Sequence, residues 1–173
     1  MARHLPQVVS LIGMPGSGKS TVGVLLAKRL GLAFVDTDLL IQNQERATLA
    51  EIIAAEGHGA LRVIEEQVLL SMDMGPSVIS TGGSVVYSEA IMNRLSNASS
   101  LVYLRSQLAT VEYRISLAPD RGIASPRNHT LEDVFNERVP LYEHYAGITV
   151  DVDTEPPETI SRQIALALQG KKM

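Results

Sequence analysis

The chain contains no cysteine and no tryptophan among its 173 residues, and it has only two phenylalanines. A chain without cysteine forms no disulfide bond, no thiolate metal site and no catalytic thiol, and it suits a reducing compartment. Hydrophobic residues nevertheless make up 45% of the sequence. The core is therefore expected to be aliphatic, and it is large enough to favour a compact fold over disorder.

An excess of positive charge is also missing, because the formal net charge is −4. Proteins that hold DNA or RNA usually carry a basic surface field, so we expect no nucleic-acid partner. No apolar run approaches the ~20 residues of a membrane span, and the apolar stretch 8–13 is too short for the core of a signal peptide. We therefore expect a cytoplasmic protein that binds no membrane, and we expect a monomer.

Short apolar runs alternate with longer helical patterns along the whole chain, without a repeat or a linker. Such alternation is typical of an α/β fold in which helices cover both faces of a parallel sheet. We therefore predict one three-layer α/β/α domain over residues 1–173, with a central five-stranded parallel sheet. The strands are predicted at 8–12, 33–35, 78–80, 101–104 and 149–152, and the helices at about 20–30, 39–44, 49–55, 61–72, 89–95, 108–117, 131–145 and 158–168, with a break at 57–59.

Residues 13–20, GMPGSGKS, fit the phosphate-loop pattern G-x-x-x-x-G-K-[ST] at every fixed position. Glycines let the backbone curl so that several N–H groups converge on phosphate oxygens, and the following helix adds the positive end of its dipole. Lys19 would reach the outer phosphates, and the Ser20 hydroxyl group would bind Mg²⁺. A plain glycine-rich turn is the alternative, but the apolar strand before the pattern and the apolar helix after it favour a nucleotide site. The expected nucleotide-binding residues are Gly13, Gly16, Ser17, Gly18, Lys19, Ser20 and Thr21.

Two carboxylates, Asp36 and Asp38, follow the predicted second strand. Ligands of parallel sheets bind beyond the carboxyl ends of the strands, so both side chains are expected near the phosphate loop. One carboxylate could face a metal ion while the other faces the hydroxyl group of an acceptor. The alternative is that the segment 36–38 only caps the next helix, because Asp and Thr are both good N-caps.

At this point the sequence resembles the shikimate kinase family. The phosphate loop is followed, in order, by FVDTD at 34–38, LRVIE at 61–65, TGG at 81–83 and RVPLY at 138–142, each similar to a motif of that family. The spacing of Arg114 and Arg121 is that of the family's adenine-stacking and lid arginines. The resemblance implies a P-loop kinase fold and the ATP-dependent phosphorylation of shikimate to shikimate 3-phosphate, with Mg²⁺ as the cofactor.

The resemblance also implies roles for individual residues at the reacting groups. Asp38 would contact the acceptor hydroxyl groups and serve as the candidate base, and Asp36 would help Ser20 to hold Mg²⁺. Arg62 and Arg138 would bind the substrate carboxylate, for which a planar guanidinium group is suited. The expected catalytic residues are Lys19, Asp38 and Arg121.

Further roles concern the walls of the pocket and a lid. Arg114 and Pro157 would flank the adenine. Arg121 would come from a mobile lid at about 118–130 onto the transferring phosphate, where positive charge assists phosphoryl transfer. The acceptor-binding region would span about 37–66. The residues nearest the substrate ring would be Gly82, Gly83 and Ser84.

Simpler interpretations stand beside these roles. Each arginine could be an ordinary solvated surface charge. Glu65 could orient Arg62, or it could form a surface pair on its helix. The segment 118–130 could be a polar loop with no part in the reaction. The four histidines are scattered, so we assign them to the surface or to packing and not to a metal.

The chain departs from the family pattern at three places. His58 stands where Glu is usual, Ser84 where a third Gly is usual, and Gly122 with Ile123 where Pro-Leu is usual. The serine adds a Cβ atom and a hydroxyl group beside the substrate ring, and the glycine makes the lid less stiff. These changes leave the nucleotide site alone and bear on the identity of the acceptor.

Two other functions compete with shikimate phosphorylation. A related sugar-acid kinase, for example one for gluconate, would also suit two arginines and an aspartate, but the histidine-bearing segment expected after the second strand is missing. A nucleotide-binding regulatory module without turnover is the second alternative. It would have no need of an acceptor base, so the presence of both Asp36 and Asp38 argues against it.

Overall fold

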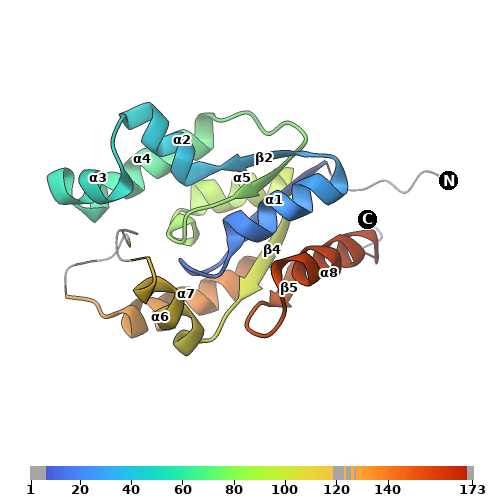
Figure 1. Cartoon of the computed structure of the whole chain (residues 1–173). Helices are drawn as coiled ribbons and strands as arrows, with labels where there is room; N and C mark the ends of the chain where they lie inside the picture. The colour runs from blue at the N-terminus through green and yellow to red at the C-terminus, as the bar shows by residue number, and fades with distance from the viewer. Residues whose placement is uncertain (1–6, 119–122, 124–125, 127, 171–173) are drawn as a thin grey trace.

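The computed structural model describes residues 7–118, 123, 126 and 128–170. Its strands form one parallel sheet in the order β2-β3-β1-β4-β5, so the predicted five-stranded parallel sheet is confirmed (Figure 1). The strands are β1 (Val8–Ile12), β2 (Ala33–Asp36), β3 (Ser77–Ser80), β4 (Ser100–Arg105) and β5 (Ile148–Asp151).

Helices cover both faces of this sheet, as predicted (Figure 1). Side chains of β4 alternate between the two faces, because successive residues of a strand point in opposite directions. Val102 and Leu104 pack with the helices on one face, whereas Leu101 and Tyr103 pack with those on the other. The first face is covered by α1 (Lys19–Leu30) and α8 (Pro157–Gly170), and the second by α5 (Glu89–Ala98), α6 (Leu108–Ser116), α7 (Leu131–Tyr145) and the 3₁₀ helix η1 (Val85–Tyr87).

Three helices form a smaller layer beside strand β2. They are α2 (Thr37–Glu45), α3 (Leu49–Glu56) and α4 (His58–Ser71), and they pack around Ile41, Ile52, Leu61 and Val68. This layer contains the region 37–66, which the sequence predicts to bind the acceptor. Within the described part of the chain, no helix is both long and apolar enough to cross a membrane.

The strand register brings the predicted motifs to one edge of the sheet. Ser80 lies opposite Leu11 on one side and opposite Asp36 on the other. The phosphate loop, the DTD segment and the TGG segment therefore all leave the sheet at the same level. This is the edge at which parallel sheets bind their ligands.

The structure corrects one local prediction and adds one element. The break expected at 57–59 is confined to Gly57, whose φ of 87° is tolerated by glycine, and His58 already begins α4. The 3₁₀ helix at 85–87 is not anticipated, because its three residues are too few for a periodic pattern. The other predicted elements are all present, with ends shifted by a few residues.

Candidate functional site

The phosphate loop joins β1 to α1 and is shaped by glycine. Gly16 and Gly18 have φ angles of 81° and 90°, in the left-handed region that only glycine enters freely. At Gly13 a Cβ atom would lie 2.7 Å from the Leu104 carbonyl oxygen, so a side chain does not fit. The buried Lys19 ammonium group donates hydrogen bonds to the carbonyl oxygens of Gly13 (2.7 Å) and Met14 (2.9 Å). The charge needed to bind phosphate is thus held inside the curl of the loop.

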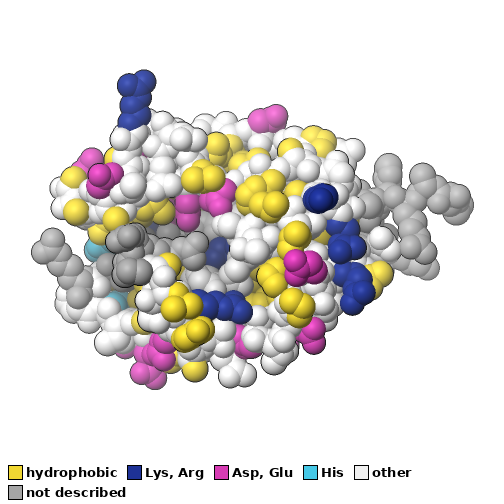
Figure 2. All heavy atoms as spheres, in the orientation of Figure 1, with side chains coloured by type: hydrophobic (Ala, Val, Ile, Leu, Met, Phe, Trp, Pro, Cys, Tyr) yellow, Lys and Arg dark blue, Asp and Glu magenta, His cyan; other side chains and the backbone are white. Residues whose placement is uncertain are grey.

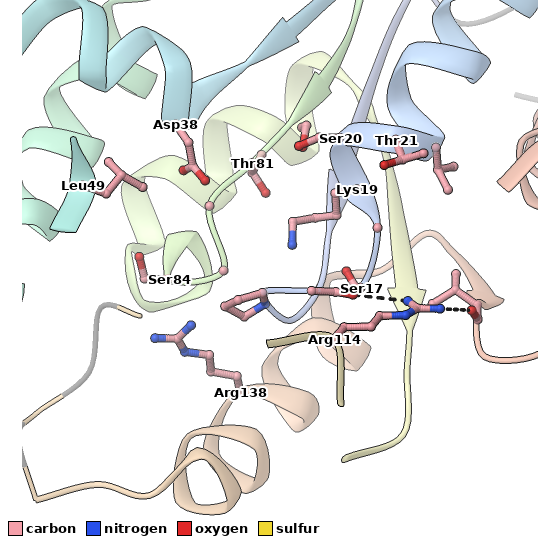
Figure 3. Close-up of a pocket in the computed structure, with 18 of the residues that line it drawn as sticks. Ser17, Lys19, Ser20, Thr21, Asp38, Leu49, Thr81, Ser84, Arg114 and Arg138 are labelled. Atoms are coloured by element: carbon pink, nitrogen blue, oxygen red, sulfur yellow. Dashed lines mark hydrogen bonds between the residues drawn. The ribbon is translucent and has the colours of Figure 1, made fainter. Parts of the chain in front are cut away.

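A pocket of about 390 Å³ opens beside this loop, at the edge of the sheet where the motifs meet. Figure 2 shows acidic and basic side chains meeting in the hollowed part of this face. Figure 3 shows Lys19 pointing into the pocket between Thr81 and the phosphate loop. Of the predicted residues, those that line the pocket are Gly16, Ser17, Gly18, Lys19, Ser20, Thr21, Asp38, Gly82, Gly83, Ser84, Arg114, Arg138 and Pro157.

Four predicted site residues are not in this lining. Gly13 and Asp36 lie just behind it, the first as the turn that opens the loop and the second as a partner of Ser20. Arg62 is not a lining residue, and its guanidinium group lies over the ring of Tyr87. Arg121 and most of the segment 118–130 lie outside the residues that the structure describes.

Three oxygen atoms converge next to the phosphate loop. The Ser20 hydroxyl group donates to Asp36 Oδ2 (2.6 Å) and lies 3.3 Å from the Ser80 hydroxyl oxygen. Hydroxyl and carboxylate oxygens are the ligand types that Mg²⁺ prefers, and Mg²⁺ at phosphate sites typically takes only one or two from the protein. The described residues accordingly contain no cluster of three or more His, Asp or Glu that would form a cage of its own. Ser80 was not predicted.

Asp36 also caps a helix, which is the simpler interpretation of the segment 36–38. Its Oδ1 atom accepts hydrogen bonds from the backbone N–H groups of Asp38 (3.0 Å) and Leu39 (3.4 Å), so it caps α2. The two interpretations are compatible, because each uses a different carboxylate oxygen. Thr37, between the two aspartates, accepts a hydrogen bond from the Gly82 N–H (3.2 Å) and so ties the DTD segment to the TGG segment.

Asp38 and Glu65 face each other across Gly82. A Cβ atom at Gly82 would lie 2.1 Å from Glu65 Oε1 and 3.3 Å from Asp38 Oδ1. Any side chain at this position would therefore displace the Glu65 carboxyl group. The backbone of residue 82 must be bare for the two acidic side chains to sit together.

Glu65 is 4% exposed, so its interpretation as a surface pair on α4 is wrong. The Ser84 hydroxyl group donates a 2.5 Å hydrogen bond to Glu65 Oε2. The pKa of Glu65 is raised to about 7, mainly by burial. The Asp38 charge also raises the pKa, whereas the Ser84 hydrogen bond and the charges of Arg138 and Arg62 lower it. Glu65 therefore exchanges its proton near neutral pH, inside the candidate acceptor site.

Arg138 is 1% exposed, which excludes a solvated surface role. Its Nε donates to the Tyr87 hydroxyl oxygen (3.3 Å), and the position of a Cβ atom on Gly83 would be 2.9 Å from its Nη1 atom. One turn later on α7, the buried Tyr142 donates a 2.5 Å hydrogen bond to the Gly83 carbonyl oxygen. This spacing explains the RVPLY motif physically, because both polar groups of one helix face are used against the TGG segment.

Tyr87 is a second residue beside the site that the sequence analysis does not single out. The Arg62 guanidinium carbon lies 4.1 Å from the centre of its ring, and that of Arg138 lies 5.2 Å from the same point. The two arginines expected to bind one carboxylate are thus brought to one aromatic ring. Tyr87 belongs to η1, which no motif marks, so the sequence alone carries no signal for it.

Arg114 lies at the other end of the pocket. It donates hydrogen bonds to the carbonyl oxygens of Gly16 (3.2 Å) and Val152 (3.0 Å), so it too is not a free surface charge (Figure 3). It joins the phosphate loop to the segment before α8, where Pro157 stands at the first helical position that suits proline. Asp153 supports this end by accepting hydrogen bonds from the Ser106 hydroxyl group (2.7 Å) and the Gln107 N–H at the start of α6.

The sequence matches known proteins over most of its length. The family model described as shikimate kinase matches residues 15–169. The chain belongs to the shikimate kinase family. Among its curated relatives, "Shikimate kinase 2" of Escherichia coli O1:K1 is 34% identical over 162 residues, covering 91% of this chain and 93% of the relative. "Shikimate kinase 2" of Yersinia enterocolitica is 31% identical over 174 residues, covering 98% and 99%.

Solved structures of the shikimate kinase family match the fold as a whole. The shikimate kinase from Acinetobacter baumannii in complex with shikimate has a TM-score of 0.87 at 29% identity, covering 98% of this chain and 96% of that one. The shikimate kinase from Aquifex aeolicus has a TM-score of 0.80 at 31% identity, covering 94% and 96%. A gluconokinase from Sinorhizobium meliloti, with a TM-score of 0.56 at 19% identity and coverage of 96% and 93%, shares the fold alone.

Proposed function

We propose that this member of the shikimate kinase family transfers the γ-phosphoryl group of ATP to the 3-hydroxyl group of shikimate. The observation that carries the proposal is the joint lining of one pocket by Lys19 of the phosphate loop and by Asp38 and Arg138. A phosphate-binding cation, a carboxylate and a guanidinium group are the three functions needed to join a nucleotide to an anionic alcohol. Family membership supplies the identity of that alcohol.

The nucleotide half of the proposal uses the loop and its far end. ATP would lie with its phosphates in the curl of residues 13–20 and its adenine between Arg114 and Pro157, which line the same pocket. The Lys19 ammonium group would exchange backbone carbonyl oxygens for phosphate oxygens. Mg²⁺ would be held by Ser20 directly and by Asp36, and it would neutralise charge on the phosphates.

The acceptor half places the hydroxyl group at Asp38. As the acceptor oxygen forms its bond to the γ-phosphorus, the bond between that phosphorus and the β–γ bridging oxygen breaks. The hydroxyl proton passes to the Asp38 carboxylate, and ADP leaves. Arg138 and Arg62 would bind the acceptor carboxylate and so orient the ring, and Arg138 is already fixed for this by burial and by Tyr87.

Arg121, in the segment 118–130, is the remaining catalytic residue of the proposed reaction. We assign it to the charge on the transferring phosphate, on the strength of its spacing from Arg114. An Arg121→Ala enzyme is expected to lose turnover by on the order of a hundredfold or more, while it still binds ATP.

ATP consumption in the presence of shikimate, of gluconate and of no acceptor tests the proposal. Turnover with shikimate alone is the expected result. Faster turnover with gluconate would replace shikimate by a sugar acid, and equal, slow ATP hydrolysis in all three reactions would reject an acceptor kinase altogether.

A further inference from the structure

The ring of Tyr87 is shared by two cations that come from different parts of the chain. Arg62 belongs to α4 and Arg138 to α7, and η1, which carries Tyr87, packs against both helices. The Arg62 guanidinium carbon lies 4.1 Å from the ring centre and the Arg138 guanidinium carbon 5.2 Å from it. Tyr87 itself is half-buried.

Two guanidinium groups so close to one point repel each other. The face of an aromatic ring carries negative partial charge, and it attracts cations most strongly where water is excluded. The Glu65 carboxyl group offsets part of this positive charge, because it interacts electrostatically with both arginines. The ring of Tyr87 is a second group that both cations share, and it attracts each of them from its face.

The hydroxyl group of Tyr87 adds direction to this attraction. It accepts a hydrogen bond from Arg138 Nε at 3.3 Å. Nε is engaged with Tyr87, and the terminal nitrogen Nη1 of the same guanidinium fork lies beside Gly83 in the pocket wall. A carboxylate is bound best by such a fork when its plane is already set.

From this arrangement we infer that Tyr87 is a positioning residue that holds Arg62 and Arg138 in place for the carboxylate of the acceptor. The inference rests on the proposed function, because it concerns the acceptor half of the same site. Tyr87 acts through the two arginines and does not line the pocket itself. It makes acceptor recognition depend on a residue that lies outside the motifs described in the sequence analysis.

Initial rates with varied shikimate and varied ATP test the inference on Tyr87→Leu and Tyr87→Phe. Tyr87→Leu removes the ring, and it is expected to raise KM for shikimate about tenfold while KM for ATP changes less than about twofold. Tyr87→Phe keeps the ring face, and its rise is expected to stay below about threefold. Tyr113→Leu, the same change on the exposed tyrosine of α6, is the matched control and should alter neither constant.

The methyl ester of shikimate separates positioning from general damage to the site. Because the ester lacks the carboxylate, Tyr87→Leu is expected to leave its KM within about twofold of the wild-type value. An unchanged shikimate KM, or a rise of the same size for shikimate, its ester and ATP, would overturn the inference. Should Tyr87→Leu fail to give a cooperative thermal transition, Tyr87→Gln also removes the ring and carries the same expectations. Absence of any shikimate turnover in the wild-type protein would instead reject the proposed function.

Discussion

The Ser84 hydroxyl group donates a 2.5 Å hydrogen bond to Glu65 Oε2 inside the candidate acceptor site. Both residues are buried, and the bond exists only because residue 84 carries a hydroxyl group. The bond lowers the pKa of Glu65, but burial raises it by more, and the resulting pKa is about 7. Ser84 therefore keeps Glu65 more ionised at neutral pH than the same carboxyl group would be without it.

Replacing Ser84 with alanine is expected to raise the pKa of Glu65. The hydrogen bond to the charged form is lost, while burial and the neighbouring Asp38 charge remain. The titration of the Glu65 carboxyl carbon, followed by NMR in both proteins, measures the effect. An unchanged or lowered pKa in Ser84→Ala would show that the hydrogen bond does not hold the carboxylate.

Glu65→Gln should change how stability depends on pH. The folded pKa of Glu65, about 7, lies above the ordinary pKa of 4.5 for a glutamate side chain. The wild-type protein therefore has its full stability from this group below pH ~4.5 and loses it as pH rises through ~7, by up to about 3 kcal/mol. Urea unfolding at several pH values should show this loss in the wild-type protein relative to Glu65→Gln. Parallel stability curves for the two proteins would contradict the raised pKa.

Lys19→Ala is expected to lower kcat by several powers of ten. Each tenfold loss corresponds to only about 1.4 kcal/mol of the barrier, and Lys19 is the cation closest to the loop carbonyls. Lys28→Ala changes an exposed lysine of the same helix and serves as the control. Near-normal turnover in Lys19→Ala, with a thermal transition like that of the wild type, would refute the assignment of the loop.

Arg138→Ala and Arg62→Ala should both weaken acceptor binding, but by different amounts. Arg138 is 1% exposed and lines the pocket, so its loss is expected to cost about 2–5 kcal/mol of acceptor binding. Arg62 is only half-buried and is not a lining residue, so a smaller loss is expected. Titration calorimetry with shikimate compares the two variants directly. A larger effect of Arg62→Ala would mean that the acceptor carboxylate is bound mainly by Arg62 of α4 and not by Arg138 of α7.

The sequence predicts the sheet and the phosphate loop well because both depend on local patterns. Apolar runs mark the buried strands, and the loop needs its glycines, Lys19 and Ser20 at fixed spacing. The position of Asp36 is likewise predictable, since it follows directly from the end of a strand. These features require little knowledge of distant parts of the chain.

The contacts of the acceptor site depend on packing between distant segments, so local sequence patterns do not predict them. Whether Glu65 lies on the surface or in the core depends on how α4 meets the TGG segment, and the structure places it in the core. Tyr87 gains its importance only because α4 and α7 deliver arginines to one ring. The contact of these two arginines with one ring cannot be inferred from the spacing of residues along the chain.

The proton acceptor is the centre of the account, and Asp38→Asn tests it together with the product. Wild-type enzyme supplied with ATP and shikimate is expected to give one phosphate ester, at the 3-hydroxyl group, in a ³¹P NMR spectrum. Asp38→Asn should retain ATP binding and lose product formation by on the order of a hundredfold or more, because the amide cannot take the hydroxyl proton. Wild-type rates of product formation in Asp38→Asn, or a phosphate ester at another hydroxyl group, would contradict the placement of the acceptor beside Asp38.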